Sequence, residues 1–288
     1  MKKVTIIDGN NFFWRVFFKA AVKGNFSKTL KGLVSSINLM RKNSLKGQRV
    51  LLTFDTCKSE KRLKLHPEYK GKRKSSLPPE MFELAMKVLP AFVEIFKYSG
   101  LSVFEGEGYE ADDYIAMLSF MLRNRNLVSI MSTDGDFPQL VTQSVSIYQP
   151  TKQINITSES FINMIGIPIK YYLDMKCMAG DKSDNIPGIA GVGEKTAMKY
   201  INEFGSYEEI CEGIKEKSKQ NKTDKKILEA GNLIKFNREL MDLDLCKADT
   251  VLKTLIRDKV QATKFDRDKL YKLLCEYEIS EMLDTFTI

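Results

Sequence analysis

The sequence has very few of the residues on which histidine and cysteine chemistry depends. Its 288 residues include one histidine, His66, so a catalytic triad or a zinc site that needs histidine has at most one candidate. The cysteines are odd in number, widely scattered and never spaced as CxxC: Cys57, Cys177, Cys211, Cys246 and Cys275. This pattern argues against a disulfide framework and a zinc knuckle, and it fits a reducing compartment. Any catalysis must therefore depend on carboxylates.

Long apolar runs are also lacking. No segment approaches the length that a membrane-spanning helix needs. The N-terminal MKKVTII begins like a signal peptide, but its apolar stretch stops at Asp8, too early for an exported segment. We therefore expect a cytoplasmic protein without a membrane partner.

Positive charge, by contrast, is plentiful. Lys and Arg number 45 against 37 Asp and Glu, which gives a net charge of +8 and a pI near 9.0. Such a balance favours a polyanionic partner such as nucleic acid, although a basic surface can also serve only solubility. The length and the 43% hydrophobic content are enough for one large or two modest domains with a buried core.

The first half of the chain alternates short β-branched runs with helix-period segments, which is the pattern of a parallel α/β sheet. Strands are expected at VTIID (4–8), VLLTFD (50–55), LSVFE (101–105), LVSIMST (127–133) and VSIYQ (145–149). Apolar spacing predicts buried helix faces at Leu30, Leu33, Val34, Ile37 and Met40, and at Met117, Leu118, Met121 and Leu122. No convincing strand follows residue 157, so we expect an α/β core over 1–156 and a helical region over 157–288.

Two charged segments interrupt this plan. Residues 58–74 contain eight Lys or Arg and two Glu, enough to attract a single nucleic-acid strand, although a solvated loop would look similar. The segment KEKSKQNKTDKK (215–226) has no apolar residue and is expected to be an exposed loop.

Acidic residues follow most of the expected strands, where ligands gather in an open parallel sheet. They are Asp8, Asp55, Glu110, Asp112, Asp113, Asp134 and Asp136, and Asp181 and Asp184 follow in AGDKSDNIPG. So many anions in one cleft would repel one another unless cations neutralise them, and ligands that are all oxygen suit Mg²⁺ or Mn²⁺. Two such ions about 4 Å apart are a known means of cleaving phosphodiesters.

Each acidic motif also has a simpler interpretation. On an ideal helix Glu110 and Asp113 share a face, whereas Asp112 points about 160° away from Glu110, so all three converge only if the helix start is irregular. Acids in a first helical turn are favoured by the helix dipole alone. The DGD of STDGDF is a good turn sequence by itself. The prediction of a metal site rests on the conjunction of these motifs.

A glycine-rich turn occurs in the second half, where IPGIAGVGEKTAMKYI (186–201) places Gly188, Gly191 and Gly193 before a helix. The sequence argues against a P-loop, because Glu194 stands where that loop needs lysine and no strand precedes it. A helix-hairpin-helix type of turn fits better, because its glycines let backbone N–H groups approach a phosphate and Lys195 could reach the same backbone. A plain helix–helix connection remains the alternative.

In order along the chain, VTIIDGN, TFD, EYKGKR, YEADD, STDGDF and GDKSDNIPGIAGVGEKTA resemble the 5′-nuclease, or flap endonuclease, family. The chain looks closest to stand-alone phage 5′→3′ exonucleases and is similar to the 5′-nuclease domain of bacterial DNA polymerase I. The resemblance implies a mostly parallel central sheet flanked by helices, a PIN-like fold. It also implies a helical arch at about 57–90 and a helix-three-turn-helix module at about 176–210.

The resemblance further implies a role for each candidate residue. One metal site would be built by Asp8, Asp55, Glu110, Asp112 and Asp113, and a second by Asp134, Asp136, Asp181 and Asp184, with two or more Mg²⁺ or Mn²⁺ ions. The residues implied beside the scissile phosphate are Lys70 and Arg73. Two others are implied in DNA contact: Tyr69, stacked on a base, and Lys176. The turn would hold the duplex backbone with a K⁺ ion, through Gly188, Gly191, Gly193 and Lys195.

The implied activity is that of a structure-specific 5′ nuclease, both flap endonuclease and 5′→3′ exonuclease. Its substrates would be DNA with 5′ flaps, nicks or 5′ ends and RNA/DNA primer junctions during replication. The resemblance suggests a monomer, which would act in the host cytoplasm if a phage encodes it.

Three alternative functions differ at identifiable features. A PIN-type ribonuclease would need neither the glycine turn nor the second helical half. A haloacid-dehalogenase phosphatase would have a second aspartate where Asn10 stands. A non-catalytic DNA-binding protein would not need nine carboxylates in one cleft.

The C-terminal EISEMLDTFTI spaces Leu283 and Phe286 like the anchors of a sliding-clamp peptide. It lacks the glutamine and the second aromatic of such a peptide. We therefore expect a final helix or a frayed tail.

Overall fold

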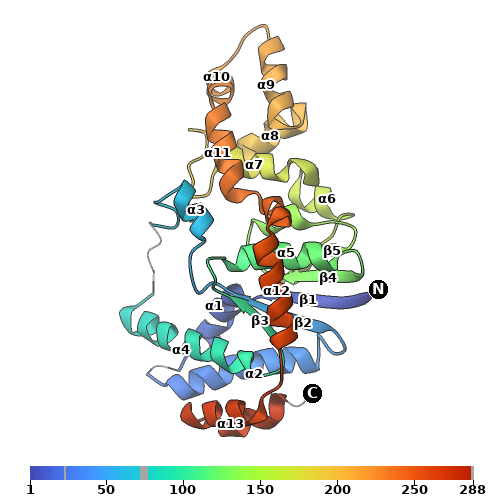
Figure 1. The fold of residues 1–288 in the computed structure, drawn as a ribbon. Helices are drawn as coiled ribbons and strands as arrows, with labels where there is room; N and C mark the ends of the chain where they lie inside the picture. Colours follow the sequence, from blue (N-terminus) through green and yellow to red (C-terminus); the bar gives the residue numbers. More distant parts are fainter. Residues whose placement is uncertain (23, 72–76, 287–288) are drawn as a thin grey trace.

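A computed structural model describes residues 1–22, 24–71 and 77–286 (Figure 1). Arg73, predicted to stand beside the scissile phosphate, lies outside the described residues. Among the described residues, no helix combines the length and the apolar character that crossing a bilayer requires.

The centre of the molecule is a six-stranded sheet in the order β3-β2-β1-β4-β5-β6. Its strands are β1 (Lys2–Asp8), β2 (Arg49–Phe54), β3 (Ser102–Glu105), β4 (Asn126–Met131), β5 (Val145–Gln149) and β6 (Ile154–Ile156). Every neighbouring pair is parallel except β5 and β6. The mostly parallel sheet is therefore confirmed, and the strand that sequence reasoning missed is the three-residue β6, too short to show an alternating pattern.

Two hydrophobic cores lie on opposite faces of this sheet. One is formed with α1 (Gly9–Ala20), α2 (Phe26–Lys42), α4 (Pro79–Lys97) and α13 (Arg267–Glu276). The other is formed with α5 (Ala111–Leu122), α12 (Thr250–Ala262) and helices of the second half. The predicted helix faces are confirmed at α2, where Leu30, Leu33 and Ile37 are buried, and at α5, where Met117 and Leu118 are buried.

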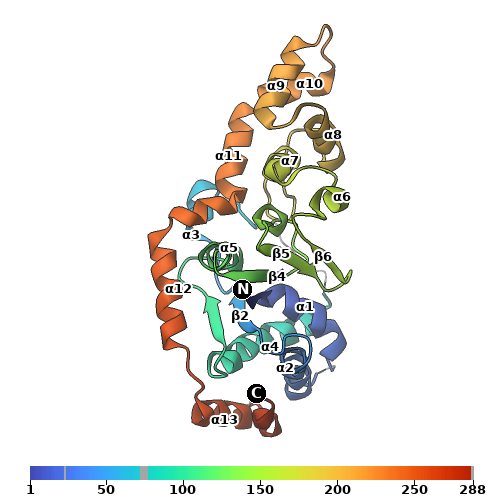
Figure 2. The same ribbon diagram turned by 90° about the vertical axis from the view of Figure 1, so that its right-hand side faces the viewer.

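The second half is helical and elongated. It contains α6 (Phe161–Ile165), α7 (Tyr172–Ala179), α8 (Glu194–Phe204), α9 (Tyr207–Glu216), α10 (Lys222–Glu229) and α11 (Gly231–Met241). Short 3₁₀ segments occur at Phe137–Leu140, Ile169–Tyr171 and Leu243–Ala248. Figures 1 and 2 show α8, α9 and α10 extending away from the sheet, at the opposite end from α13.

The predicted loop over 215–226 is partly wrong. Its first two residues, 215–216, belong to α9. Its last five residues, 222–226, belong to α10, which begins with a capping box between Asn221 and Asp224. Capping and the burial of Ile227 stabilise this helix. Neither feature depends on apolar residues within 215–226, so the composition of that segment could not reveal the helix.

The last described segment of the chain packs into the core. The final 3₁₀ segment, Ser280–Phe286, buries Met282, Leu283 and Phe286, and the Phe286 ring centroid lies 5.8 Å from that of Phe96 in α4. Both residues that resembled clamp anchors, Leu283 and Phe286, therefore face the protein interior. The alternative of a frayed tail is wrong over the described residues.

Candidate active site

A small acidic pocket lies beyond the carboxyl ends of β1, β2 and β4. Its volume is about 230 Å³, and it is lined by seven aspartates together with five other side chains: Asp8, Asp55, Asp112, Asp134, Asp136, Asp181 and Asp184, with Asn10, Asn11, Trp14, Lys70 and Ser183. The structure thus brings seven of the nine predicted acids to one place. They come from five separate stretches of chain, as the crossovers of a parallel sheet allow.

The wall at β1 and β2 is fixed by short hydrogen bonds. Asp8 ends β1 and caps α1, accepting from the Asn11 backbone N–H (3.0 Å), and its other oxygen accepts from the Ser132 hydroxyl (2.7 Å). Asp55 follows β2 and accepts from the backbone N–H of Ala111 (2.6 Å), at the start of α5. Strand ends and helix starts therefore hold these two carboxylates in place.

The three acids of YEADD separate as helix geometry predicts. Asp112 points into the pocket, whereas Glu110 and Asp113 form a capping box and both pair with Arg62 of α3 (Glu60–Leu65). A helix that begins regularly at Ala111 keeps Asp112 on a different face from the other two. Glu110 and Asp113 do not line the pocket, so the predicted convergence of all three acids does not occur here.

The STDGDF segment forms a tight turn after β4. The Asp136 backbone N–H donates to Asp134 Oδ1 (2.9 Å), and the Asp134 N–H donates to the Ser132 hydroxyl (3.0 Å). The turn and the acidic site thus coincide: the local hydrogen bonds that favour DGD as a turn also aim both carboxylates at the pocket.

Lys176 is an internal counter-ion of this pocket. It is only 6% exposed, and its Nζ lies 3.0 Å from Asp136 Oδ1 and 3.2 Å from Asp181 Oδ2. The prediction that Lys176 contacts DNA does not agree with this arrangement, because α7 directs the side chain inward. It neutralises two aspartates from different halves of the chain.

Tyr69 is likewise buried, at 2% exposure. Its hydroxyl lies 2.9 Å from Glu110 Oε2 and 3.1 Å from Asp184 Oδ2. A ring enclosed in this way cannot stack on a base, so the structure does not support that prediction. The buried hydroxyl instead links the first turn of α5 to the loop after α7.

Lys70 lies in the pocket wall, as predicted for a residue beside the reacting phosphate. Its backbone adopts φ = 52°, an uncommon left-handed conformation for a non-glycine residue. Its N–H donates to the Asp184 carbonyl (2.9 Å), and its Nζ donates to Glu110 Oε1 (2.8 Å). Such a conformation persists where surrounding contacts determine it, and it is concentrated at functional sites.

Burial and crowding alter the acidity of the pocket. Burial, reinforced by Asp55 and Asp134, raises the pKa of Asp8 to about 7, against the hydrogen bonds from Asn11 and Ser132. Burial also raises the pKa of Asp136 to about 6, even though Lys176 acts in the opposite direction. The pKa of Asp112 is raised for the same reasons, burial first and Asp134 second.

The donor set fits hard divalent cations. Seven aspartates, two asparagines and one serine supply side-chain oxygens, and no histidine or cysteine is among the described residues that line the pocket. One oxygen, Asp136 Oδ1, is buried and lies 3.0 Å from the Lys176 ammonium, so a positive charge already stands beside it. Over the described ranges, no three His, Cys, Asp or Glu side chains yet stand close enough to hold an ion. Mutual repulsion spreads bare carboxylates, and a cation favours their approach.

The glycine turn between α7 and α8 has a structural and an exposed part. A Cβ on Gly188 would lie 2.1 Å from the Ala179 carbonyl oxygen, so this glycine permits close backbone packing. Gly191 has φ = +85°, and Gly193 precedes α8 without a side-chain cap. Gly191, Gly193 and Lys195 are exposed around the start of α8.

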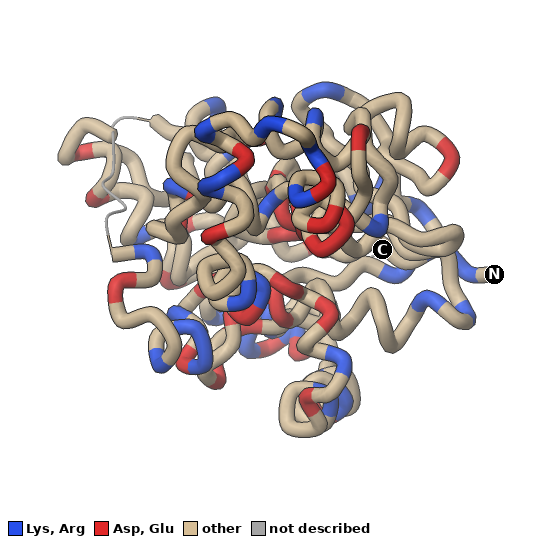
Figure 3. The backbone as a smooth tube through the Cα atoms, turned by 90° about the horizontal axis from the view of Figure 1, so that it is seen from above, with Lys and Arg blue, Asp and Glu red and all other residues tan. Residues whose placement is uncertain are grey.

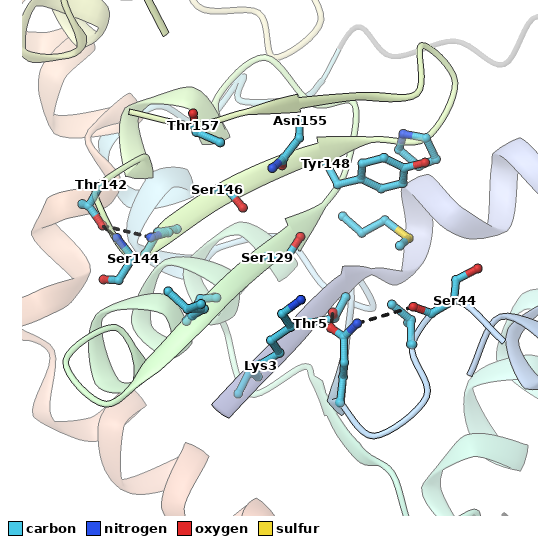
Figure 4. Close-up of a pocket in the computed structure, with 18 of the residues that line it drawn as sticks. Lys3, Thr5, Ser44, Ser129, Thr142, Ser144, Ser146, Tyr148, Asn155 and Thr157 are labelled. Atoms are coloured by element: carbon cyan, nitrogen blue, oxygen red, sulfur yellow. Dashed lines mark hydrogen bonds between the residues drawn. The ribbon is translucent and has the colours of Figure 1, made fainter. Parts of the chain in front are cut away.

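A larger concavity, of about 670 Å³, lies elsewhere, over β1, β4, β5 and β6 (Figure 4). Its floor is a row of small hydroxyl side chains at matching register, Thr5, Ser129 and Ser146. It contains no cluster of carboxylates, so the smaller, acidic pocket is the candidate active site.

In the view of Figure 3, many Asp and Glu positions gather near the middle of the molecule, with Lys and Arg spread across it.

Comparison with known families identifies the family of the chain that forms this pocket. The family model "5′-3′ exonuclease, N-terminal resolvase-like domain" matches residues 3–166, and "5′-3′ exonuclease, C-terminal SAM fold" matches residues 167–268. The chain belongs to the 5′-3′ exonuclease family. The predicted family and fold class are thereby confirmed.

Individual relatives agree with this family. The 5′-3′ exonuclease of Aquifex aeolicus is 31% identical, over 98% of this chain and 94% of its own length. DNA polymerase I of Mycobacterium tuberculosis is also 31% identical over 97% of this chain, which spans 31% of that longer protein.

Solved structures of a phage protein give the same fold. The T5 D15 protein, co-crystallised with metal ions, superposes with a TM-score of 0.76 at 26% identity, covering 91% of this chain and all of that one. The bacteriophage T5 D15 flap endonuclease in a pseudo-enzyme-product complex with DNA and metal ions has a TM-score of 0.67 at 27% identity, covering 97% and 100%.

Sequence reasoning missed several residues that line the acidic pocket. Asn10 and Asn11 line the pocket, and Asn10 Oδ1 accepts from the Asp55 N–H (3.0 Å). Their position within three residues of Asp8 was the available signal. Arg62 carried no signal, because it stands among seven other basic residues in 58–74 and its burial is set by tertiary structure.

Proposed function

We propose that this member of the 5′-3′ exonuclease family is a structure-specific 5′ nuclease that hydrolyses phosphodiesters in branched or nicked DNA and in RNA/DNA primer junctions. The observation that carries the proposal is the acidic pocket, in which seven aspartates surround a cavity of about 230 Å³ beside Lys70. We include a role in removing replication primers, which the similarity to DNA polymerase I supports.

The residues that would hold divalent ions are the pocket aspartates. We assign Asp8, Asp55 and Asp112 to one side of the pocket and Asp134, Asp136, Asp181 and Asp184 to the other. Mg²⁺ or Mn²⁺ suits this oxygen-only set. When bound, such ions lower the pKa of an attacking water and stabilise charge on the leaving oxygen. The expected products carry a 5′-phosphate and a 3′-hydroxyl.

Lys70 supplies fixed positive charge at the pocket. Burial lowers its pKa, but the nearby Asp112 and Glu110 outweigh burial, and the pKa is raised overall. Lys70 therefore stays protonated at neutral pH and can attract the scissile phosphate into a pocket that is otherwise anionic. The described residues of the predicted arch, 57–71 and 77–90, would lead the 5′ strand to it.

The turn before α8 would hold the duplex. Its exposed glycines permit a close approach of the DNA backbone, and the uncapped first turn of α8 offers N–H donors and positive potential. Lys195 adds a charge that can reach the same phosphates. We also assign the predicted K⁺ to this turn, where backbone carbonyls and a phosphate could share it.

One comparison of substrates tests the proposal. Cleavage of a 5′-flapped duplex, a plain duplex and an RNA hairpin is measured with Mg²⁺ and with EDTA. The flapped duplex should be cut fastest with Mg²⁺, and EDTA should abolish all cleavage. Preferential cutting of the RNA hairpin would instead indicate a PIN-type ribonuclease, and undiminished cutting in EDTA would refute a metal mechanism.

A further inference from the structure

Arg62 is an unusually buried charge next to the candidate active site. It is 7% exposed and lies in α3, at the base of the basic segment 58–74. Arginine is seldom buried without partners, because removing its charge from water costs several kcal/mol. The partners of Arg62 therefore show what its burial achieves.

Those partners come from two distant segments. One Arg62 guanidinium nitrogen lies 3.1 Å from Glu110 Oε2 and the other 2.9 Å from Asp113 Oδ1, both at the start of α5. The Arg62 Nε donates to the backbone carbonyl of Leu240 (3.0 Å), near the end of α11. Arg62 thus ties the base of the basic segment to α5 and to the helical half of the chain.

The same Glu110 also positions Lys70. Glu110 Oε1 accepts from Lys70 Nζ (2.8 Å), while its Oε2 accepts from both Arg62 and the Tyr69 hydroxyl. The loop after α7 adds a second hold, because Asp184 accepts from the Tyr69 hydroxyl and from the Lys70 backbone N–H. Lys70 is therefore placed by a network in which Arg62 neutralises the carboxylates.

We propose that Arg62 is a positioning residue, which keeps Glu110 and Asp113 as its counter-ions and through Glu110 sets Lys70 at the acidic pocket. In this proposal Glu110 and Asp113 bind cationic side chains of the basic segment and are not metal ligands. Of the three acids, Asp112 alone is assigned to the metal site. The inference rests on the proposed nuclease function. It also makes a claim about ion binding that needs no cleavage.

The chemistry of the arrangement supports this division. Glu110 and Asp113 make their short contacts with cationic side chains, whereas Asp112 lines the pocket among other aspartates. Without Arg62, Asp113 would lose its cationic partner and Glu110 would keep Lys70 alone, and breaking a buried pair in this way is strongly unfavourable. Lys70 would lose the fixed acceptor that orients it.

The first test is kinetic coupling between Arg62 and Lys70. In single-turnover cleavage of the flapped duplex, Arg62→Lys should slow the chemical step by about 100-fold, the scale of a small misplacement of a catalytic group. The dissociation constant for DNA should change less than about threefold, and in a Lys70→Ala background Arg62→Lys should have little further effect, because coupled residues are not additive. A full additional loss in that background would overturn the proposal.

Arg238→Lys is the matched control. Arg238 also pairs with two carboxylates, Asp174 and Glu208, but lies in α11 away from the pocket. Its replacement should leave the single-turnover rate unchanged. An equal slowing by both lysine variants would show that losing any paired arginine damages the chain, and the specific role of Arg62 would be withdrawn.

The second test is Mn²⁺ binding to the DNA-free protein, measured by calorimetry. Asp112→Asn should weaken Mn²⁺ binding at least about tenfold, because losing a metal ligand costs at least as much affinity as losing a residue that supports a ligand. Asp113→Asn should change Mn²⁺ binding less than about threefold, because Asp113 is assigned to Arg62 and not to the metal. Equal losses in both variants would make Asp113 a ligand and overturn the proposal. This test stands if Arg62→Lys fails to fold. It also separates the two claims, because inactivity of the wild-type protein refutes only the nuclease function.

Discussion

Asp112 and Asp113 are neighbours in the sequence and yet have different partners. Asp112 lines the acidic pocket, and Asp113 pairs with Arg62. The sequence predicts the presence of all these acids and, through helix geometry, their divergence. It does not show which face meets the pocket, because that depends on how α5 packs against a strand end and α3.

Buried contacts also bear on two predictions of DNA contact that the structure does not support. Tyr69 and Lys176 stand in motifs that resemble DNA-contacting positions, but each is nearly enclosed and bonded to pocket carboxylates. Exposure is a tertiary property, and a sequence of one chain does not carry it for an isolated tyrosine or lysine.

Asp134→Asn tests the assignment of the STDGDF turn. The amide keeps the shape of the side chain but removes its charge, so cation binding should weaken and cleavage should fall to background. DNA affinity should persist, because Asp134 repels phosphate rather than binding it. Cleavage assays and DNA titrations in Ca²⁺ or EDTA measure the two effects, and normal cutting by the variant would exclude this turn from the site.

Two lysines should separate chemistry from binding. Lys70→Ala is expected to slow the single-turnover rate more than it weakens DNA binding, because Lys70 lies in the pocket wall. Lys195→Ala should do the reverse, since Lys195 is exposed beside the glycine turn. Single-turnover rates and separate affinity measurements decide the matter. The opposite pattern would contradict both assignments.

At the scale of elements, the turn between α7 and α8 depends on two backbones that pass very close together. A Cβ on Gly188 would collide with the Ala179 carbonyl, and one on Gly180 would collide with the Gly188 nitrogen. The sequence predicts a turn from its glycines, but it does not distinguish the glycine that packs from those that remain exposed.

Gly188→Ala should therefore destabilise the fold by about 1–3 kcal/mol, the usual cost of overpacking. Gly231→Ala is the matched control, because no atom lies within 4 Å of its Cβ position and it begins α11. Urea unfolding followed by circular dichroism gives both free energies. Equal stability of the two variants would contradict the close approach described at Gly188.

The C-terminal 3₁₀ segment should contribute to stability rather than to partner binding. Phe286→Ala removes a ring that is 3% exposed, and the expected loss is about 3 kcal/mol. Tyr271→Ala, at a position that is 49% exposed, should cost little. Thermal unfolding compares them, and an unchanged midpoint for Phe286→Ala would support a free tail with clamp-like anchors.

At the scale of the whole molecule, the acidic pocket needs both halves of the chain. Asp181 and Asp184 follow α7 in the helical half, whereas the other pocket aspartates belong to the sheet half. Lys176 joins them by pairing with Asp136 and Asp181. The pocket is thus formed by residues from both matched family segments, 3–166 and 167–268.

Much of this arrangement could be predicted because parallel strands end at one edge of a sheet. Runs such as VTIID and LVSIMST showed the strands and the acids after them, and therefore the place where they meet. Three features could not be predicted. The edge strand β6 is too short to show an alternating pattern, and the helical part of 215–226 contains no apolar residue. The burial of Arg62 depends on partners distant in sequence.

The most direct measurement is a crystal structure of this protein grown with Mn²⁺ and recorded for anomalous scattering. The account predicts anomalous density inside the pocket, within coordination distance of oxygens from Asp112 and from at least one aspartate of the second group. Density confined to other surfaces, with a pocket that binds no ion at Mn²⁺ concentrations supporting cleavage, would contradict it.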